Sequence, residues 1–349
     1  MDVPYLSFLK IDFIGRKGRG YMFAHIIQTL PQVLIDGLTL GAVYAIIALG
    51  YTMVYGILEL INFAHGEIFM SGAFIGTAIL IGLTGVGWIA AFPAVVTLIL
   101  VLLITSVATG FLGMGIERVA YRPLRKSSKL ITLITAIGMS FLLQDFVRFI
   151  TELKNGNYIV NTPALFSGKV SVSASSLSSS FDDATFKVTF IVVLIVALCL
   201  MIGLEIFVNR TKWGMAMRAV AQDPDTASLM SINVNKVISL TFFIGSALGG
   251  ATGVLFALHY GTIDPYIGFI LGLKAFTAAV LGGIGNIRGA MFGGLMLGIL
   301  EMFAAANLST ITGNVLGAEY KDVFAFAILI LVLIFKPEGL FGKAVTEKV

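Results

Sequence analysis

The run IFMSGAFIGTAILIGLTGVGWIAAFPAVVTLILVLLITSVATGFLGMGI, residues 68–116, contains no Asp, Glu, Lys or Arg. A helix needs about 20 apolar residues to cross the roughly 30 Å of hydrocarbon in a bilayer, so this run is long enough for two spans. Gly82, Thr84, Gly85 and Gly87 lie just before Trp88 and supply a turn next to an interfacial aromatic residue. We therefore predict two membrane-spanning helices joined by a short turn.

The composition of the whole chain agrees with this. Of its 349 residues, 58% are hydrophobic and 12% are charged, and a soluble chain could not bury so much apolar surface. The continuous runs, rich in Leu, Ile, Ala and Gly, exclude a barrel of short alternating strands. We predict an all-α polytopic membrane protein with about 8 (8–10) transmembrane helices. The further spans are expected at 37–58, 130–150, 186–208, 237–258 and from about 323 to 335.

Two apolar segments, 275–287 and 289–300, are each too short to cross a membrane alone. Irregular backbone survives at membrane depth only when it is buried in protein or lines a cavity. We therefore expect short broken or re-entrant helices near a pathway. Glycines and an arginine interrupt this region and two charged residues flank it, which gives the pathway candidates Gly282, Gly283, Gly285, Lys274 and Glu301, with Arg288 beside them.

Basic loops indicate the orientation. Lys and Arg are concentrated in the loop at 117–129 and in the insert at 209–236, which predicts that both face the cytoplasm. The Ser-rich loop at 151–185 then falls outside, as a flexible periplasmic excursion. Counting back puts the N-terminus on the periplasmic side, whereas the basic residues of the N-terminal extension, 1–25, favour the opposite side. The sequence leaves this conflict open.

The insert at 209–236, NRTKWGMAMRAVAQDPDTASLMSINVNK, is polar and lies between two spans. Asp223 is a good N-cap and Pro224 suits the first helical position, so a short helix is expected to begin there. Leu229, Met230 and Ile232 are apolar groups on a hydrophilic loop, which favours insertion into a groove on a partner protein. A merely structured membrane loop is the alternative.

Catalytic motifs are missing from the sequence. It contains no G-x-x-x-x-G-K-[ST] and no G-x-S-x-G, and its three histidines lack metal-binding spacing. We expect no ATPase, other catalytic site, cofactor or metal on this chain. Membrane topology accounts for the basic residues, so no nucleic-acid partner is expected. The scarcity of acidic groups at mid-span disfavours an ion-coupled transporter.

The segment GLTLGAVYAIIALGYTMVYGILELINFAHGEIFMSG, residues 37–72, resembles the opening of the permease subunits of bacterial branched-chain amino-acid ABC importers, and INFAHGE at 61–67 is its most specific part. The chain is similar to the H-type subunit of this Liv type, and the similarity covers nearly everything beyond about residue 30. Further matching segments are ERVAYRPLR at 117–125, AIGMS at 136–140, RAVAQDPDTASLMSINVNKVISLTFFIG at 218–245, GTIDPYIGFILGLKAFTAAVLGGIGNIRGAMFGG at 261–294, EYKDV at 319–323 and KPEGLFG at 336–342.

The resemblance implies a single transmembrane permease domain, 1–349, in the lipid bilayer of the bacterial cytoplasmic (inner) membrane. It also implies two ATP-binding subunits, a periplasmic substrate-binding protein and a second permease subunit, which is either a related M-type chain or a second copy. The insert 209–236 becomes the cytoplasmic coupling segment. Its ATPase-coupling candidates are Arg218, Ala221, Asp223, Pro224, Ala227, Leu229, Met230, Ser231 and Ile232; the motif candidates for the pathway are Asn62, His65, Gly66 and Glu67.

The chain departs from the family pattern at two positions. Ser231 stands where the family usually has glycine, which costs free energy if the turn needs a positive φ. Arg288 replaces a proline that often follows the glycine-rich segment. Three other functions remain open: an ABC permease for urea or amides, an ion-coupled secondary amino-acid transporter, and a channel or scaffold without energised transport.

Overall fold

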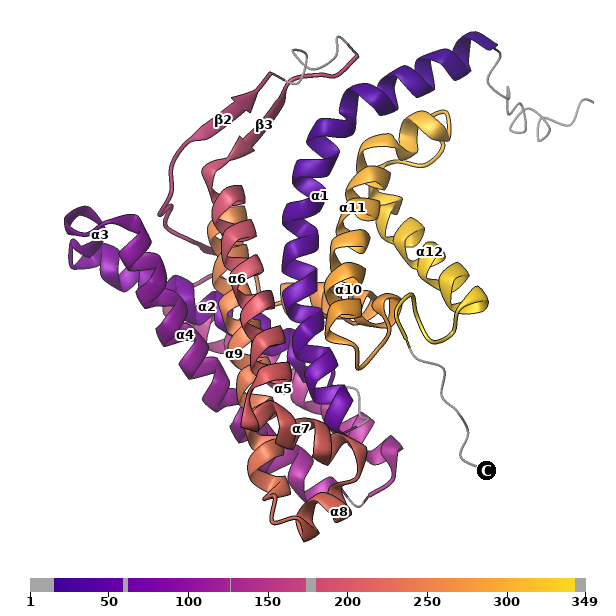
Figure 1. Ribbon diagram of the computed structural model, residues 1–349. Coiled ribbons are helices and arrows are strands. Elements are labelled where there is room, and N and C mark those ends of the chain that lie inside the picture. Colours follow the sequence, from indigo (N-terminus) through magenta and orange to yellow (C-terminus); the bar gives the residue numbers. More distant parts are fainter. Residues whose placement is uncertain (1–15, 59–61, 126, 174–179, 343–349) are drawn as a thin grey trace, which may run out of the picture.

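The computed structural model describes residues 16–58, 62–125, 127–173 and 180–342, and helices dominate it (Figure 1). A π-helical turn at Glu117–Tyr121 and a 3-10 turn at Arg122–Leu124 follow the helix Ala94–Ile116, and a second 3-10 turn at Ala318–Tyr320 precedes the helix Lys321–Phe335. The helices are α1 Arg16–Leu58, α2 Ala64–Gly85, α3 Trp88–Ala91, α4 Ala94–Ile116, α5 Lys129–Asn155, α6 Val188–Arg210, α7 Lys212–Gln222, α8 Pro224–Leu229, α9 Val234–Tyr260, α10 Ile267–Gly282, α11 Ile287–Ile311 and α12 Lys321–Phe335. The strands are β1 Val160–Asn161, β2 Lys169–Val172, β3 Ala184–Lys187 and β4 Thr262–Ile263.

Seven of the described helices are long and apolar enough to cross a membrane: α1, α2, α4, α5, α6, α9 and α11. The prediction of an all-α polytopic protein is confirmed. The predicted range of eight to ten spans is reached only when at least one of the shorter helices α10 and α12, of 16 and 15 residues, is counted as well.

The predicted pair of helices in 68–116 is confirmed as α2 and α4. The chain turns between them at Gly87, whose φ of 75° suits a residue without a side chain. The prediction of a short segment at 289–300 is wrong, because it forms part of the 25-residue α11. The Asn286 side chain caps α11, accepting the N–H of Gly289 at 3.1 Å, so that helix starts at the interruption and continues. The neighbouring α10 is short, as expected, but it begins eight residues before the predicted segment 275–287 and ends at Gly282.

The first helix is longer than the predicted span at 37–58. α1 has 43 residues and begins at Arg16, inside the segment predicted as an N-terminal extension. Residues 1–15 of that extension lie outside the described residues. Pro31 is within α1, where a proline removes one backbone hydrogen bond and favours a bend. Figure 1 shows the upper part of α1 turning aside.

The two ends of the bundle differ. At one end β2 and β3 form an antiparallel hairpin with Lys169 opposite Lys187, and Thr185 of β3 donates its N–H to the Gln32 side chain of α1 at 2.9 Å. At the opposite end lie α7 and α8 (Figure 1). The start of α1 and the hairpin therefore share the end away from α8, which agrees with counting the spans back from the basic loops.

The loop predicted as a flexible excursion thus contains regular structure. β2 contains Val170 and Val172 and β3 contains Thr185 and Phe186, and such β-branched and aromatic residues favour the pairing of β2 with β3. Residues 174–179 of the Ser-rich stretch lie outside the described residues. Earlier in the loop, β1 pairs antiparallel with β4, and this pairing ties the loop to the end of α9.

α1 and α9 form the centre of the bundle, where α1 packs mainly on α11 and α9 packs on α4 and α2. Along α1, residues 42–49 are almost completely buried. Glycines allow the close approach of α2 and α9: a Cβ added at Gly253 would collide with the Phe69 carbonyl, and one at Gly72 with Gly250. The small residues spaced four apart therefore serve helix packing here.

Candidate functional site

Two short helices project from the end of the bundle opposite the β2/β3 hairpin. The Thr211 hydroxyl caps α7 by accepting the Gly214 N–H at 3.1 Å. The Arg218 guanidinium, one turn before the end of α7, donates to the Val208 carbonyl of α6. Because a Cβ at Gly214 would also collide with the Val208 carbonyl, α7 folds tightly back on the end of α6. Ala221, the next candidate on α7, is half-buried.

The prediction that a helix begins at Pro224 is confirmed. The Asp223 carboxylate accepts the N–H groups of Asp225 at 3.0 Å and Thr226 at 3.1 Å, and Asp223 itself has extended backbone. Pro224 occupies the first helical position, where no N–H is needed. The start of α8 is therefore fixed by local chemistry.

The exit from α8 is a Schellman turn. The Ser231 N–H donates to the Ser228 carbonyl and the Ile232 N–H to the Ala227 carbonyl, both at 3.1 Å. The turn requires left-handed backbone at its pivot, and Ser231 has a φ of 62°. The turn thus needs a positive φ, so serine at this position costs free energy relative to the glycine that the family usually has. After the turn, the Asn233 side chain accepts the Lys236 N–H at 3.0 Å and starts α9.

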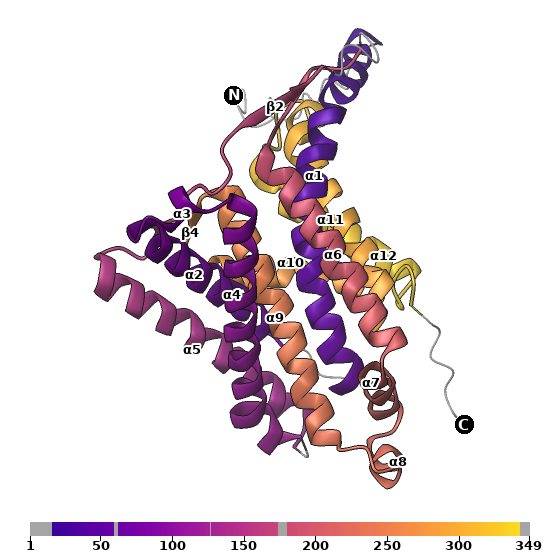
Figure 2. The same cartoon turned by 60° about the vertical axis from the view of Figure 1, so that its left-hand side comes forward.

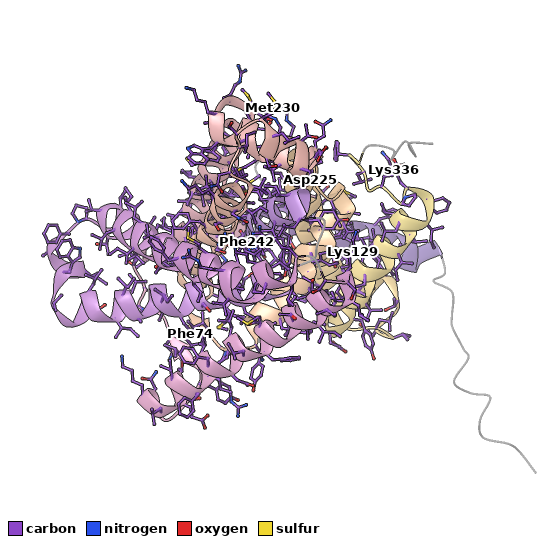
Figure 3. All side chains as sticks on the ribbon, turned by 90° about the horizontal axis from the view of Figure 1, so that it is seen from below. Phe74, Lys129, Asp225, Met230, Phe242 and Lys336 are labelled. Atoms are coloured by element: carbon purple, nitrogen blue, oxygen red, sulfur yellow. The ribbon has the colours of Figure 1, made fainter. Side chains whose placement is uncertain are left out.

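Side chains of α8 divide into an anchoring and an exposed set. Ala227 is 4% exposed, and Ile232 packs against the core. Leu229 and Met230 are 84% and 74% exposed. Figure 3 looks onto this end and shows Met230 at the tip of the projection, with Asp225 nearby. Of the three apolar groups predicted to enter a partner groove, Leu229 and Met230 are the most exposed and Ile232 is half-buried, and their entry into a groove stays a prediction.

The motif cluster, which we define as Asn62, His65, Gly66 and Glu67, lies at the start of α2 in the middle of the protein. Asn62 Oδ1 accepts the Tyr121 hydroxyl at 2.6 Å. His65 is 1% exposed and its ring packs edge-on against Tyr51, with 4.8 Å between the ring centroids. Among the described residues neither ring nitrogen of His65 has a hydrogen-bond partner.

Glu67 of the motif cluster is completely buried. Its Oε1 accepts the Ser140 hydroxyl of α5 at 3.2 Å, whereas its Oε2 has no partner within the described part of the chain. The carboxyl group lies against Gly268 in the first turn of α10, and Gly66 packs on Gly272 of the same helix. The cluster therefore joins α2, α5 and α10 around buried polar groups that are only partly satisfied.

The space beside the cluster is small. A cavity of about 10 Å³ is bounded by Tyr51, Tyr55, Asn62 and Phe276. That volume is about the minimum for one water molecule. The motif cluster is thus closed in this conformation, and any passage for a solute requires the surrounding helices to separate.

Lys274 and Glu301, predicted as pathway candidates on either side of the glycine-rich segment, are in direct contact. Lys274 Nζ lies 2.8 Å from Glu301 Oε1 and 2.7 Å from Asp322 Oδ1, and Lys321 Nζ lies 3.2 Å from Glu301 Oε1. The Tyr44 hydroxyl donates to Glu301 Oε2 at 2.7 Å. We call these five residues the ion network. Its formal charges balance, and it joins α1, α10, α11 and α12.

Gly282, Gly283 and Gly285 form the turn between α10 and α11. Gly283 and Gly285 have φ values of 102° and 88°, which side chains disfavour. The C-terminal segment docks on this turn: the N–H groups of Leu340 and Phe341 donate to the Leu281 and Gly282 carbonyls at 2.8 and 3.0 Å. The glycines therefore shape a turn and a docking surface. Arg288, which follows them, is exposed and pairs with Glu205 at 2.7 Å.

Several partners of the candidate residues were not singled out from the sequence. They are Tyr44, Tyr121, Ser140, Lys321 and Asp322. All except Tyr44 lie in the short segments ERVAYRPLR, AIGMS and EYKDV, and Tyr44 lies in the segment 37–72. The resemblance had marked these segments without giving them a role. Their long-range pairing with the candidates was the missing signal.

Comparison with known sequences gives a consistent result. The family described as "Branched-chain amino acid transport system / permease component" matches residues 33–333. The chain is 47% identical over 322 residues to the high-affinity branched-chain amino acid transport system permease protein LivH of Escherichia coli strain K12, covering 91% of this chain and 97% of that protein. It is 46% identical to BraD of Pseudomonas aeruginosa, a permease protein of the same description, with the same coverage. No solved structure matches the chain.

Proposed function

Because the chain belongs to the branched-chain amino acid transport system permease family, we propose that it carries branched-chain amino acids into the cell. It is a permease component of an ABC importer, a multi-pass membrane protein that works with ABC partner subunits. The transport energy then comes from ATP hydrolysis on those partners. The bacterial cytoplasmic membrane is the proposed location, with α7 and α8 on the cytoplasmic side.

The observation that carries the coupling role is the exposed pair Leu229 and Met230 on a rigidly held helix. Exposed apolar side chains on a polar projection are suited to a groove on a partner protein. Thr211, Asp223 and Asn233 cap the starts of α7, α8 and α9 respectively, and Ala227 anchors α8 to the core. We assign α8 as the coupling helix that docks on an ATP-binding subunit.

A movement of α8 has a short route into the membrane. α9 starts four residues after Met230 and packs along α2. A Cβ placed at Gly249 of α9 would lie 3.5 Å from the His65 ring, so α9 is in close contact with the motif cluster. A tilt of α9 would therefore displace the motif cluster, whose side chains are closely packed in this conformation. This is a hinge-type mechanism in which a rigid element transmits a groove movement to the pathway.

The proposed assembly contains two ATP-binding subunits, a second permease subunit and a periplasmic substrate-binding protein. The described part of this chain offers one α8, and a second docking helix must then come from another permease chain. That chain is either a related M-type subunit or a second copy. The second copy would give an isologous pair, whereas the related chain would give a heterodimer.

ATP-dependent uptake of labelled leucine into proteoliposomes tests the proposal. The permease is reconstituted with its ATP-binding, second permease and substrate-binding partners. The test variant is Leu229→Ala/Met230→Ala. The matched control is Leu153→Ala, which removes a 77% exposed leucine from the last turn of α5, toward the opposite end. Unlabelled isoleucine, valine, urea and amides compete in parallel to identify the substrate class.

We expect uptake to require ATP and to be lost in the double variant while the control keeps it. The variant should still insert in the membrane, because neither side chain is buried. Uptake that ignores ATP and follows a proton or sodium gradient would overturn the ABC assignment. Uptake that requires ATP but survives in the double variant would refute the coupling role of α8 and leave the ABC assignment unchanged. If urea or amides compete with leucine uptake and isoleucine does not, the proposed substrate class changes from branched-chain amino acids to urea or amides.

A further inference from the structure

A basic pocket of about 830 Å³ opens between α4, α6, α7 and α9. α9 packs against α4, α6 and α7, and Figures 1 and 2 show α7 at the lower end of α6. Arg118, Arg122 and Lys236 are among the residues that line it, together with Trp213. Leu229 and Met230 are not among the lining residues, so the pocket is a feature separate from that exposed pair.

The charge of the pocket is not neutralised by the protein. Within the described residues, Arg118, Arg122 and Lys236 make no ion pair or hydrogen bond with their charged groups, and no Asp or Glu lines the pocket. The carboxylate next to Arg118 in the chain belongs to Glu117. It is completely buried, pairs with Arg125 and accepts the Ser239 hydroxyl at 2.7 Å. Three cations therefore surround a volume without a counter-charge.

Part of the remaining wall of the pocket is apolar and belongs to membrane-spanning helices, whereas Asn233, Asn235 and Ser239 line the rest. The apolar part includes Leu240 and Phe243 of α9, Phe207 of α6 and Met114 of α4. Trp213 on α7 is 49% exposed, and tryptophan favours the membrane–water interface. The pocket thus offers positive charge at the interface and apolar contact one or two turns deeper.

We propose that this pocket binds an anionic phospholipid, with its phosphate on Arg118, Arg122 and Lys236 and its acyl chains along α9. Arg and Lys both bind phosphate oxygens, and basic pockets between membrane helices recognise anionic headgroups. An acidic protein surface would use the cations but leave the apolar wall empty. A free phosphate would do the same. A lipid would use both the cations and the apolar wall, and it would hold α6, α7 and α9 together.

The test is native mass spectrometry of the purified chain with phosphatidylglycerol or phosphatidylcholine as the added lipid. The pocket variant is Arg118→Gln/Lys236→Gln. The matched control, Arg210→Gln/Lys212→Gln, removes two exposed cations from the same end that do not line the pocket. Inorganic phosphate is added in a separate arm as a competitor. Size-exclusion profiles establish that both variants are folded.

We expect wild type and control to retain phosphatidylglycerol in preference to phosphatidylcholine. The pocket variant should bind phosphatidylglycerol about 30-fold more weakly, equivalent to about 1 kcal/mol for each cation. Equal retention by the pocket variant and the control would overturn the proposal. Displacement of the lipid by millimolar phosphate would overturn it in favour of a free-anion site. In a further arm with added ATP-binding subunits, failure of the pocket variant alone to bind them, with its lipid binding unchanged, would overturn the proposal in favour of a protein contact.

Discussion

Replacing Ser231 by glycine should stabilise the exit of α8. Ser231 is one of two described non-glycine residues with positive φ, at 62°, and it forms the pivot of the Schellman turn. Left-handed backbone costs an L-residue about 1–2 kcal/mol relative to glycine. Glycine loses about 0.5–1 kcal/mol more conformational freedom on ordering. The net gain for Ser231→Gly is therefore about 0.5–1 kcal/mol.

Hydrogen exchange measures this gain where it arises, because the two amides of the turn are those of residues 231 and 232. In nanodiscs, a gain of 0.5–1 kcal/mol should slow their exchange about two- to fivefold. Ser231→Val should speed it, since a β-branched residue is a poor fit at positive φ. Asn314→Gly is the matched control: Asn314 has a φ of 65°, and asparagine tolerates this region better than serine.

The control should therefore show a smaller change around residue 314 than Ser231→Gly shows around 231. If α8 is the coupling helix, Ser231→Gly should also retain ATP-dependent uptake, whereas Ser231→Val should lower it. Exchange at Ile232 that is unchanged or faster in Ser231→Gly would refute the assignment of strain to this turn. A response at 314 as large as at 231 would show that the effect is not specific to serine.

Further substitutions test the other features. Asp223→Ala should cost about 1 kcal/mol of α8 stability, seen as about fivefold faster exchange at the first turn, and Asp223→Asn should restore most of it. Lys274→Met and Glu301→Gln should each lower the free energy of unfolding, measured by thermal denaturation, by about 3–5 kcal/mol. The double variant should lower it by less than the sum of the two single losses, and additive losses would contradict a coupled network. Gly253→Val should abolish the folded peak in size-exclusion chromatography, because its Cβ would collide with α2, whereas Gly115→Ala, which has open space, should not.

Local chemistry made part of this structure predictable. The Asp223–Pro224 pair defines the start of α8, and the glycines before Trp88 define the turn between α2 and α4, because each signal acts within a few residues. The interruption before α11 was read as a break, yet Asn286 converts it into a helix start. Residue type alone did not separate these outcomes, since glycine both ends helices and packs within them.

The buried contacts of the candidate site were less accessible from the sequence. Tyr44 and Glu301 are 257 positions apart, and only the antiparallel packing of α1 on α11 brings them together. Lys274 and Glu301 were chosen because charge is costly in hydrocarbon, and that reasoning found both residues but not their mutual contact. The exposure of Leu229 was correctly expected, whereas Ile232 is held by the Schellman turn, in which the residue after the pivot packs back on the helix.

The docking of the C-terminal segment on the α10–α11 turn bears on the order in which the protein matures during translation. When the ribosome has completed α11, the carbonyls of Leu281 and Gly282 still lack the N–H groups of Leu340 and Phe341. These donors emerge only after α12, so the last turn of α10 receives its hydrogen-bond partners among the last steps of synthesis. A premature stop before Leu340 would spare every long span and still leave these two carbonyls without those partners, as a defined target for membrane quality control.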